Sequence, residues 1–207
     1  MTGKVRAVAN QKGGVGKTTL AMNLAAGLVR RGSCGVVDAD PQGLATMWAR
    51  VATAPPRFPV EVMPAPAALE SRLAGLNGQY DFVVIDCPPA IESSNVTAAI
   101  LNAQVLLIPV LPSPMDFWAS VRIEEMVERV RLRNPGIRAF IVLNQIEARS
   151  QETALAEFAV PVLRQRLSRR ASYRSAVLEG CSVYELGARG ATAAGEIENI
   201  IEEVLNP

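Results

Sequence analysis

Residues 12–19 read Lys-Gly-Gly-Val-Gly-Lys-Thr-Thr, a glycine-rich stretch that contains two of the chain's three lysines. In a phosphate-binding loop of the form Gly-x4-Gly-Lys-Ser/Thr, backbone N–H groups surround the phosphates, the lysine reaches their outer oxygens and the hydroxyl binds Mg²⁺. Gly16, Lys17 and Thr18 fit this form, whereas Gln11 stands where its first glycine is expected. Lys12 adds a second cation. The loop precedes a helical pattern, and a helix N-terminus attracts phosphate.

Three aspartates follow apolar segments further along the chain. Asp38 and Asp40 lie in the sequence Val-Val-Asp-Ala-Asp-Pro-Gln-Gly, and Asp86 ends the run Val-Val-Ile-Asp. Beside a triphosphate, one carboxylate can help to hold the water shell of Mg²⁺ while another positions the attacking water. An aspartate that ends an apolar strand also matches the Walker B pattern. We therefore expect Asp86 to meet Mg²⁺ through water and Thr18 to bind it directly.

Short apolar segments alternate with helical ones, which is typical of repeated βαβ units. Strands are expected at 5–9, 35–38, 60–63, 82–86, 105–110 and 139–144, with a short seventh at 160–163. Helices are expected at 17–30, 43–51, 67–76, 93–102, 118–133, 151–158, 172–179 and 193–205. The pattern predicts a three-layer α/β fold with a mostly parallel, twisted sheet flanked by helices. Ligands of such sheets gather at the carboxyl ends of the strands, where the aspartates lie.

The bulk composition limits the possible classes. The 207 residues suit one α/β domain that spans 1–207, and the net charge of +1 means that any affinity for nucleic acid must come from a local patch. No apolar run approaches the roughly 18 residues of a membrane span, and we expect neither a transmembrane helix nor a secretory signal. Cys34, Cys87 and Cys181 lack metal-binding spacing, so we expect reduced thiols in the cytoplasm.

The sequence Lys-Gly-Gly-Val-Gly-Lys-Thr-Thr resembles the deviant Walker A motif of the ParA/MinD family of partitioning and positioning ATPases, and the later motifs extend this resemblance over nearly the whole chain. It implies a P-loop ATPase that binds ATP and Mg²⁺, turns over slowly and forms a homodimer when ATP is bound. It also implies that Lys12 reaches across the dimer to the partner's nucleotide. The residues expected to bind ATP are Lys12, Gly13, Gly14, Val15, Gly16, Lys17, Thr18, Thr19 and Asn144.

The resemblance also assigns roles at the strand ends. Asp40 is the residue that positions the attacking water, and it is expected to be catalytic together with Lys12 and Lys17. Asp38 is expected to join Thr18 and Asp86 around Mg²⁺. Asn144 matches the asparagine that contacts the base, since a side-chain amide can pair with the edge of adenine. A simpler role, as a turn-forming asparagine after a strand, remains open for Asn144.

The last third of the chain separates its charges. The segment 158–178 has no acidic residue but contains Arg164, Arg166, Arg169, Arg170 and Arg174. These arginines form either a solvated basic face or, as the resemblance implies, a surface for non-specific DNA that places the protein on the nucleoid. The segment 191–207 is acidic instead, which argues against a basic amphipathic membrane anchor. Its apolar face is expected to dock on the core through Ile197, Ile200, Ile201, Val204 and Leu205.

The leading interpretation is an ATPase whose dimer binds DNA and whose hydrolysis is triggered by a ParB-like or other small partner protein. The chain resembles the short members of the family, without an N-terminal DNA-reading domain. Alternatives are a membrane-positioning ATPase of the MinD type, a ligase like dethiobiotin synthetase, and an electron-transfer ATPase like the nitrogenase iron protein. Lys12 together with 38–42 argues against the ligase, and the cysteine positions argue against the iron protein. The cargo stays open: a plasmid, a chromosome, a carboxysome-like compartment or a chemoreceptor cluster.

Overall fold

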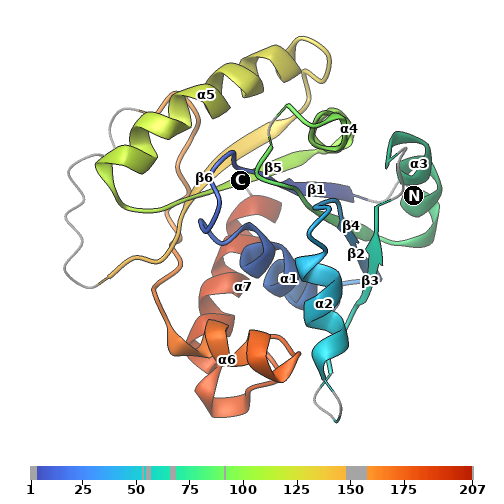
Figure 1. Ribbon diagram of the computed structural model, residues 1–207, viewed down its shortest axis with the longest axis vertical. Helices are drawn as coiled ribbons and strands as arrows, with labels where there is room; N and C mark the ends of the chain where they lie inside the picture. The colour runs from blue at the N-terminus through green and yellow to red at the C-terminus, as the bar shows by residue number, and fades with distance from the viewer. Residues whose placement is uncertain are drawn as a thin grey trace.

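A computed structural model describes residues 4–52, 54, 57–65, 69–90, 92–147 and 158–206. Within them lies a six-stranded, all-parallel sheet with the strand order β3-β2-β4-β1-β5-β6 (Figure 1). The strands are β1 (Lys4–Val8), β2 (Cys34–Asp38), β3 (Glu61–Pro64), β4 (Phe82–Asp86), β5 (Val105–Val110) and β6 (Arg138–Leu143). The expected parallel sheet is confirmed.

The central strands are buried on both faces, as the apolar runs of β2, β4 and β5 require. Their register decides where the acidic side chains stand. Asp38 pairs with Asp86 across β2 and β4, and Val8 pairs with Asp86 across β1 and β4. Two of the three aspartates therefore lie next to each other, at the point where β1 turns into the glycine-rich loop.

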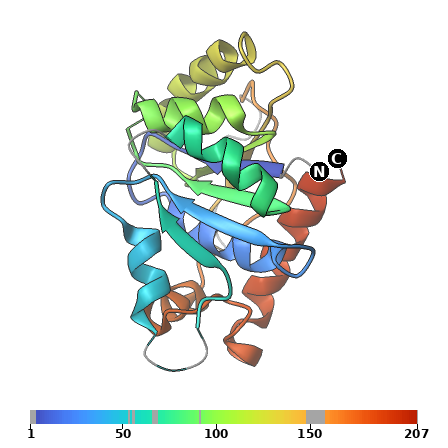
Figure 2. The same cartoon turned by 90° about the vertical axis from the view of Figure 1, so that its right-hand side faces the viewer.

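Helices cover both faces of the sheet (Figures 1 and 2). They are α1 (Lys17–Leu28), α2 (Leu44–Val51), α3 (Leu69–Gln79), α4 (Ser94–Asn102), α5 (Pro114–Arg131), α6 (Ala171–Glu179), the 3₁₀ helix η2 (Gly187–Arg189) and α7 (Ala191–Leu205). One core cluster joins the sheet to α1, α2, α6 and α7, and the other joins it to α3, α4 and α5. The three expected layers are thus present.

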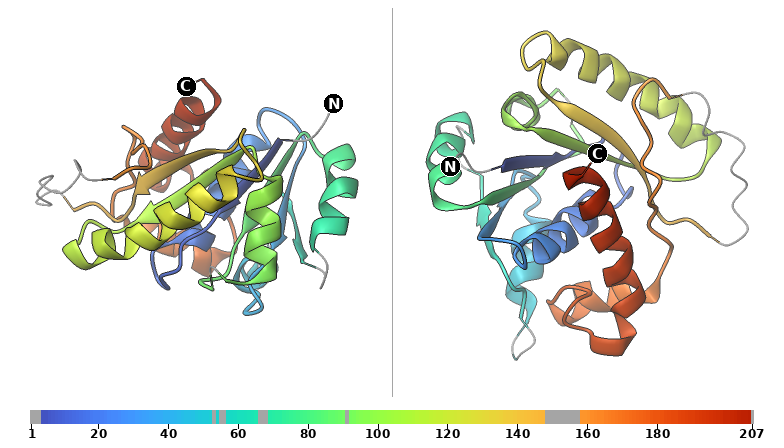
Figure 3. Two further views of the ribbon diagram at one scale, coloured as in Figure 1. Left: turned by 90° about the horizontal axis from the view of Figure 1, so that it is seen from above. Right: turned by 180° about the vertical axis from the view of Figure 1, so that it is seen from behind.

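The C-terminal helix α7 packs against α1, which Figure 3 shows from behind. Ile197, Ile200, Ile201 and Val204 are buried there, so the expected docking of the apolar face on the core is confirmed. Leu205 is half-buried at its end. At Gly27 of α1, an added Cβ would approach the Ile201 Cδ1 atom to 2.4 Å, which shows how closely the two helices meet.

Two expected elements differ from the structure. The seventh strand at 160–163 is wrong, because only isolated parallel bridges join Val162 to Ile141 and Ser168 to Ile146. Pro161 has no N–H to donate, so a regular ladder along the edge of β6 is interrupted there. The helix expected at 118–133 begins earlier, at Pro114, a residue favoured in the first turn. The helix expected at 151–158 lies, except for Phe158, outside the described residues.

Candidate functional site

The glycine-rich loop joins β1 to the N-terminus of α1 and has the backbone shape of an anion-binding turn. Gly14 and Gly16 adopt left-handed conformations with φ of 76° and 90°, and Gly16 caps the helix. A Cβ on Gly16 would lie 2.2 Å from the Nδ2 atom of Asn144. Both the dihedral angle and the close approach exclude a larger residue at Gly16. The free N–H groups at this end of α1 can receive phosphate oxygens.

Lys17 is buried under the loop. Its side chain is 7% exposed, and its Nζ atom donates a hydrogen bond to the carbonyl of Lys12 at 2.9 Å. Burial lowers the pKa of the Lys17 ammonium, and the neighbouring carboxylates of Asp86 and Asp40 oppose that change. The ammonium is thus held at the loop beside acidic groups. The half-buried Lys12 is held through its own backbone N–H, which donates to Asn10 Oδ1 at 3.0 Å.

Asp86 is fully buried, and among the described residues neither of its carboxylate oxygens has a hydrogen-bond partner of ordinary geometry. Burial raises the pKa of Asp86 to about 7; the Thr18 hydroxyl and the Lys17 ammonium oppose the shift, and Asp38 adds to it. A desolvated carboxylate without a partner is costly unless a cation compensates it. The oxygen donors of Asp86, Thr18 and Asp38 are the kind that Mg²⁺ takes, so these residues fit that ion.

In the described part of the chain, no group of three or more His, Cys, Asp or Glu side chains could hold a metal ion. A metal cage made by the protein alone is therefore absent from these residues. Mg²⁺ in phosphate-transfer sites differs from such a cage, because one or two carboxylates, waters and the substrate's phosphates complete its shell. The arrangement around Asp86 agrees with the second kind of site.

Asp38 and Asp40 have different surroundings. The Oδ2 atom of the buried Asp38 accepts two hydrogen bonds of 2.8 Å, from the backbone N–H and the hydroxyl of Thr46, and so fixes the first turn of α2. Asp40 is half-buried, and its Oδ1 atom accepts from the Gln42 N–H at 2.9 Å. Asp40 also lines a cavity of about 470 Å³ that extends to Asn95 of α4. This cavity leaves room for a reacting group beside Asp40.

Another cavity, of about 600 Å³, lies between the segment after β6 and the end of α7, where Phe140, Arg164 and Glu203 line it. It is larger than the cavity at Asp40 but contains none of the residues that the sequence predicts to bind nucleotide. We assign the nucleotide to the carboxyl edge of the sheet on the basis of chemistry, because the glycine loop, Lys17 and the aspartates meet there.

Asn144 contacts the loop, and both atoms of its side-chain amide form hydrogen bonds. Its Nδ2 atom donates to the carbonyl of Val15 at 2.7 Å, and its Oδ1 atom accepts from the Gln145 N–H at 2.8 Å. The Nε2 atom of Gln145 donates to the carbonyl of Gly14 at 3.3 Å. Contact between Asn144 and adenine stays a prediction. The structure adds a second role for this residue, which is to hold the loop.

Sequence reasoning missed three residues of this site: Asn10, Thr46 and Gln145. Asn10 connects the loop to β5, because its Nδ2 atom donates to the Pro109 carbonyl at 2.7 Å while Oδ1 holds Lys12. The only signal for Asn10 is its position between β1 and the loop. Thr46 and Gln145 carry no local signal, since their partners lie 8 and 131 residues away along the chain.

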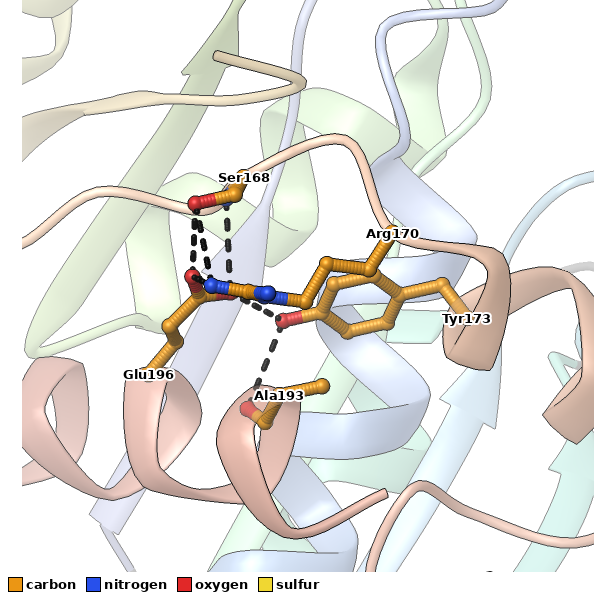
Figure 4. A network of polar contacts seen from close by, with 5 residues as sticks. All are labelled: Ser168, Arg170, Tyr173, Ala193 and Glu196. Carbon is orange, nitrogen blue, oxygen red and sulfur yellow. Dashed lines mark hydrogen bonds and ion pairs between the residues drawn. The ribbon is translucent and has the colours of Figure 1, made fainter. Parts of the chain in front are cut away.

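The five arginines of the segment 158–178 do not form one free basic face. Arg170 donates to Glu196 Oε1 through Nε at 2.9 Å and Nη2 at 2.7 Å. Ser168 and the hydroxyl of Tyr173 donate to the same carboxylate (Figure 4). The interpretation of a solvated basic face is therefore wrong for Arg170. Arg170 holds the segment 158–178 to α7. Its acidic partner, Glu196, belongs to a helix that lies further along the chain.

The other arginines are more accessible. Arg169 forms an ion pair of 2.7 Å with Glu147, and both side chains are more than half exposed. Arg164 and Arg174 are exposed, and Arg166 is half-buried. Contact of these residues with DNA stays a prediction. Among the described residues, no helix has the length and apolar character to span a membrane.

Comparisons with known proteins agree with this geometry. The family described as the CobQ/CobB/MinD/ParA nucleotide binding domain matches residues 6–183. The maintenance of carboxysome distribution protein A of Halothiobacillus neapolitanus is 45% identical, over 96% of this chain and 95% of its own. The protein of the same name from Gloeobacter kilaueensis is 35% identical, over 97% and 94%.

Among solved structures, an ATP complex of a Cyanothece McdA variant is similar in fold. Its TM-score is 0.78 at 19% identity, and the match covers 98% of this chain and 96% of that one. The family match and the two relatives indicate the same family as the glycine-rich loop and the strand-end aspartates do. The chain belongs to the CobQ/CobB/MinD/ParA family of nucleotide-binding domains.

Proposed function

We propose that this protein binds and slowly hydrolyses ATP with Mg²⁺ in order to position a cargo. The observation that carries the proposal is the fully buried Asp86 carboxylate, which lies beside the Thr18 hydroxyl and the Lys17 ammonium and, among the described residues, has no hydrogen bond of ordinary geometry. Such a carboxylate is stabilised when a cation arrives with its ligand. The geometry of the loop and of α1 supplies the complementary phosphate site.

Each residue of the edge has a role in this proposal. The N–H groups of the loop and the Lys17 ammonium bind the phosphates. Thr18, Asp86 and Asp38 hold Mg²⁺, which neutralises phosphate charge when it is bound. Asp40 orients the attacking water from its position on the cavity. Asp38 additionally fixes α2 through Thr46, so it connects the metal shell to the helix that follows Asp40.

The proposed active form is a homodimer with ATP bound between the protomers. Lys12 lies at the start of the loop and is half-buried, and we assign its side chain to the mouth of the site. In the dimer, Lys12 of each protomer contacts the nucleotide of the other. A small partner protein stimulates hydrolysis and so separates the dimer.

The relatives support a protein compartment as the cargo. Two proteins named for the maintenance of carboxysome distribution match this chain over nearly their whole length. We therefore favour a carboxysome or similar compartment over a plasmid or chromosome. The dimer binds DNA of the nucleoid non-specifically through Arg164, Arg166, Arg169 and Arg174, and Arg170 is omitted because Glu196 occupies its guanidinium.

Sizing chromatography with a non-hydrolysable ATP analogue and Mg²⁺ tests the proposal. The parent is expected to shift from monomer to dimer. Lys12→Ala is expected to keep part of its affinity for the analogue but to remain monomeric, whereas Lys17→Ala loses the affinity itself. A parent that does not bind the analogue would refute nucleotide binding. A Lys12→Ala protein that still dimerises would refute the role of Lys12 across the interface.

A further inference from the structure

The turn that follows β6 contacts the glycine-rich loop through two adjacent amide side chains. We propose that Asn144 and Gln145 are positioning residues, which hold the loop in its phosphate-binding shape. This inference rests on the proposed nucleotide binding and specifies how its site is built. It assigns Gln145 a role that the sequence did not predict.

Asn144 is fixed on three sides. Its backbone N–H donates to the Val110 carbonyl at 2.8 Å, which attaches it to the end of β5. Its side chain is buried, and its Nδ2 atom donates to Val15 at 2.7 Å. The space above Nδ2 is filled by the α-carbon region of Gly16, where a Cβ would come within 2.2 Å. The absence of a side chain at Gly16 thus allows the amide to reach the loop.

Gln145 takes an unfavourable backbone conformation to make its contact. Its φ of 55° is the only positive value among the described non-glycine residues. Such a conformation persists where the surroundings hold it, and it is concentrated at functional sites. Ile146 supplies that support, because its N–H donates to Leu167 at 3.0 Å and its carbonyl accepts from Arg169 at 3.0 Å. The side chain of Gln145 is thereby directed to the Gly14 carbonyl.

The two contacts determine which way the loop's N–H groups point. In a planar trans peptide, the carbonyl of one residue and the N–H of the next point in opposite directions. Asn144 and Gln145 draw the carbonyls of Val15 and Gly14 toward β6. The N–H groups of Gly16 and Val15 therefore point away from β6, toward the side where phosphate binds. Preorganised donors of this kind bind an anion without the entropic cost of ordering the loop.

Calorimetry with three probes, each with Mg²⁺, separates this role from base recognition: ATP, GTP and inorganic tripolyphosphate. Asn144→Ala and Gln145→Met remove the amide donors, the second at nearly constant side-chain size. Gln145→Met is expected to bind all three probes at least about tenfold more weakly than the parent, by a common factor, because about 1.4 kcal/mol corresponds to tenfold. Asn144→Ala is expected to weaken tripolyphosphate binding by a similar factor. The ratio of ATP to GTP affinity is expected to stay unchanged in Gln145→Met.

Tyr173→Phe is the control for general loss of stability. It removes the hydroxyl that donates to Glu196, away from the loop, and is expected to lower the melting temperature without changing affinity. The two loop variants should also raise KM for ATP while kcat at saturating ATP stays near the parent value. That division would not result from a smaller folded fraction, which lowers the apparent kcat instead.

Several results would overturn the inference. A variant that loses ATP affinity but keeps tripolyphosphate affinity would show that the amides read the base. Unchanged affinity for all probes in both variants would show that the contacts do not hold the loop. If Asn144→Ala fails to fold, the more exposed Gln145 decides the question alone through Gln145→Met. A parent that binds none of the probes would overturn the proposed function together with this inference.

Discussion

Two regions of the molecule each contain a largely buried carboxylate: the carboxyl edge of the sheet, and the face between α6 and α7. The two carboxylates differ in whether the protein supplies their hydrogen-bond donors. Asp86 is fully buried, and among the described residues it has no hydrogen bond of ordinary geometry. Glu196, whose side chain is 15% exposed, accepts from Ser168, Arg170 and Tyr173. The first carboxylate is left to be compensated by a ligand, and the second is compensated by the fold.

The difference distinguishes a functional charge from a structural one. A buried polar group without a partner costs free energy, about 1–3 kcal/mol and more when charged, so a fold retains it only where something else uses it. A carboxylate with a full set of donors fixes the elements that supply those donors. On this basis, substitutions at the edge should change activity more than stability, and substitutions around Glu196 should do the reverse.

The largest expected effect is on turnover, in Asp40→Ala. Because we assign Asp40 to the attacking water and not to the nucleotide or the metal, hydrolysis should fall by roughly 10²–10⁴ while ATP binding persists. Steady-state ATPase assays and sizing chromatography with ATP would show a dimer that is trapped. Hydrolysis at the parent rate would move the water-positioning role to another residue, and Asp38 would be the next candidate.

The second prediction compares the two carboxylates directly. Asp86→Asn should weaken Mg²⁺-dependent ATP binding by roughly 10–100-fold, as disturbed metal sites do, while the melting temperature without ligand does not fall. Glu196→Gln should lower the free energy of unfolding by about 1–3 kcal/mol, because the Arg170 guanidinium loses its charged partner, and leave ATP affinity unchanged. Calorimetry and thermal unfolding measure both quantities. The comparison fails if both variants lose stability and affinity alike.

The sequence predicts the edge of the sheet well, because its chemistry is local. A few adjacent residues, Gly16, Lys17 and Thr18, predict the backbone turn and the start of α1. The apolar run before Asp86 predicts a buried parallel strand. All six described strands and the three layers follow from the same alternation. This locality explains why the fold could be predicted together with the position of the loop and the aspartates at one edge of the sheet.

The rest depends on contacts between distant segments, which a local pattern does not contain. Arg170 and Glu196 are 26 residues apart, and Gln145 meets Gly14 across 131 residues. An asparagine after a strand suits several roles, so the contact of Asn144 with Val15 could not be selected beforehand. The bridges at Val162 and Ser168 depend likewise on how the segment after Pro161 lies along β6.

The smallest expected effect concerns DNA and separates the arginines by their partners. Arg164→Glu with Arg174→Glu, both at exposed positions, should weaken DNA binding and reduce the salt slope by roughly 0.9 for each phosphate that the variant no longer neutralises. Arg170→Ala should instead lower thermal stability, because it leaves Glu196 without its charged donor, and should preserve the slope. Titration of ATP-loaded protein with DNA at several salt concentrations measures the slope. If Arg170→Ala reduces it as strongly as the exposed pair does, the ion pair with Glu196 opens on binding, and Arg170 belongs to the DNA surface after all.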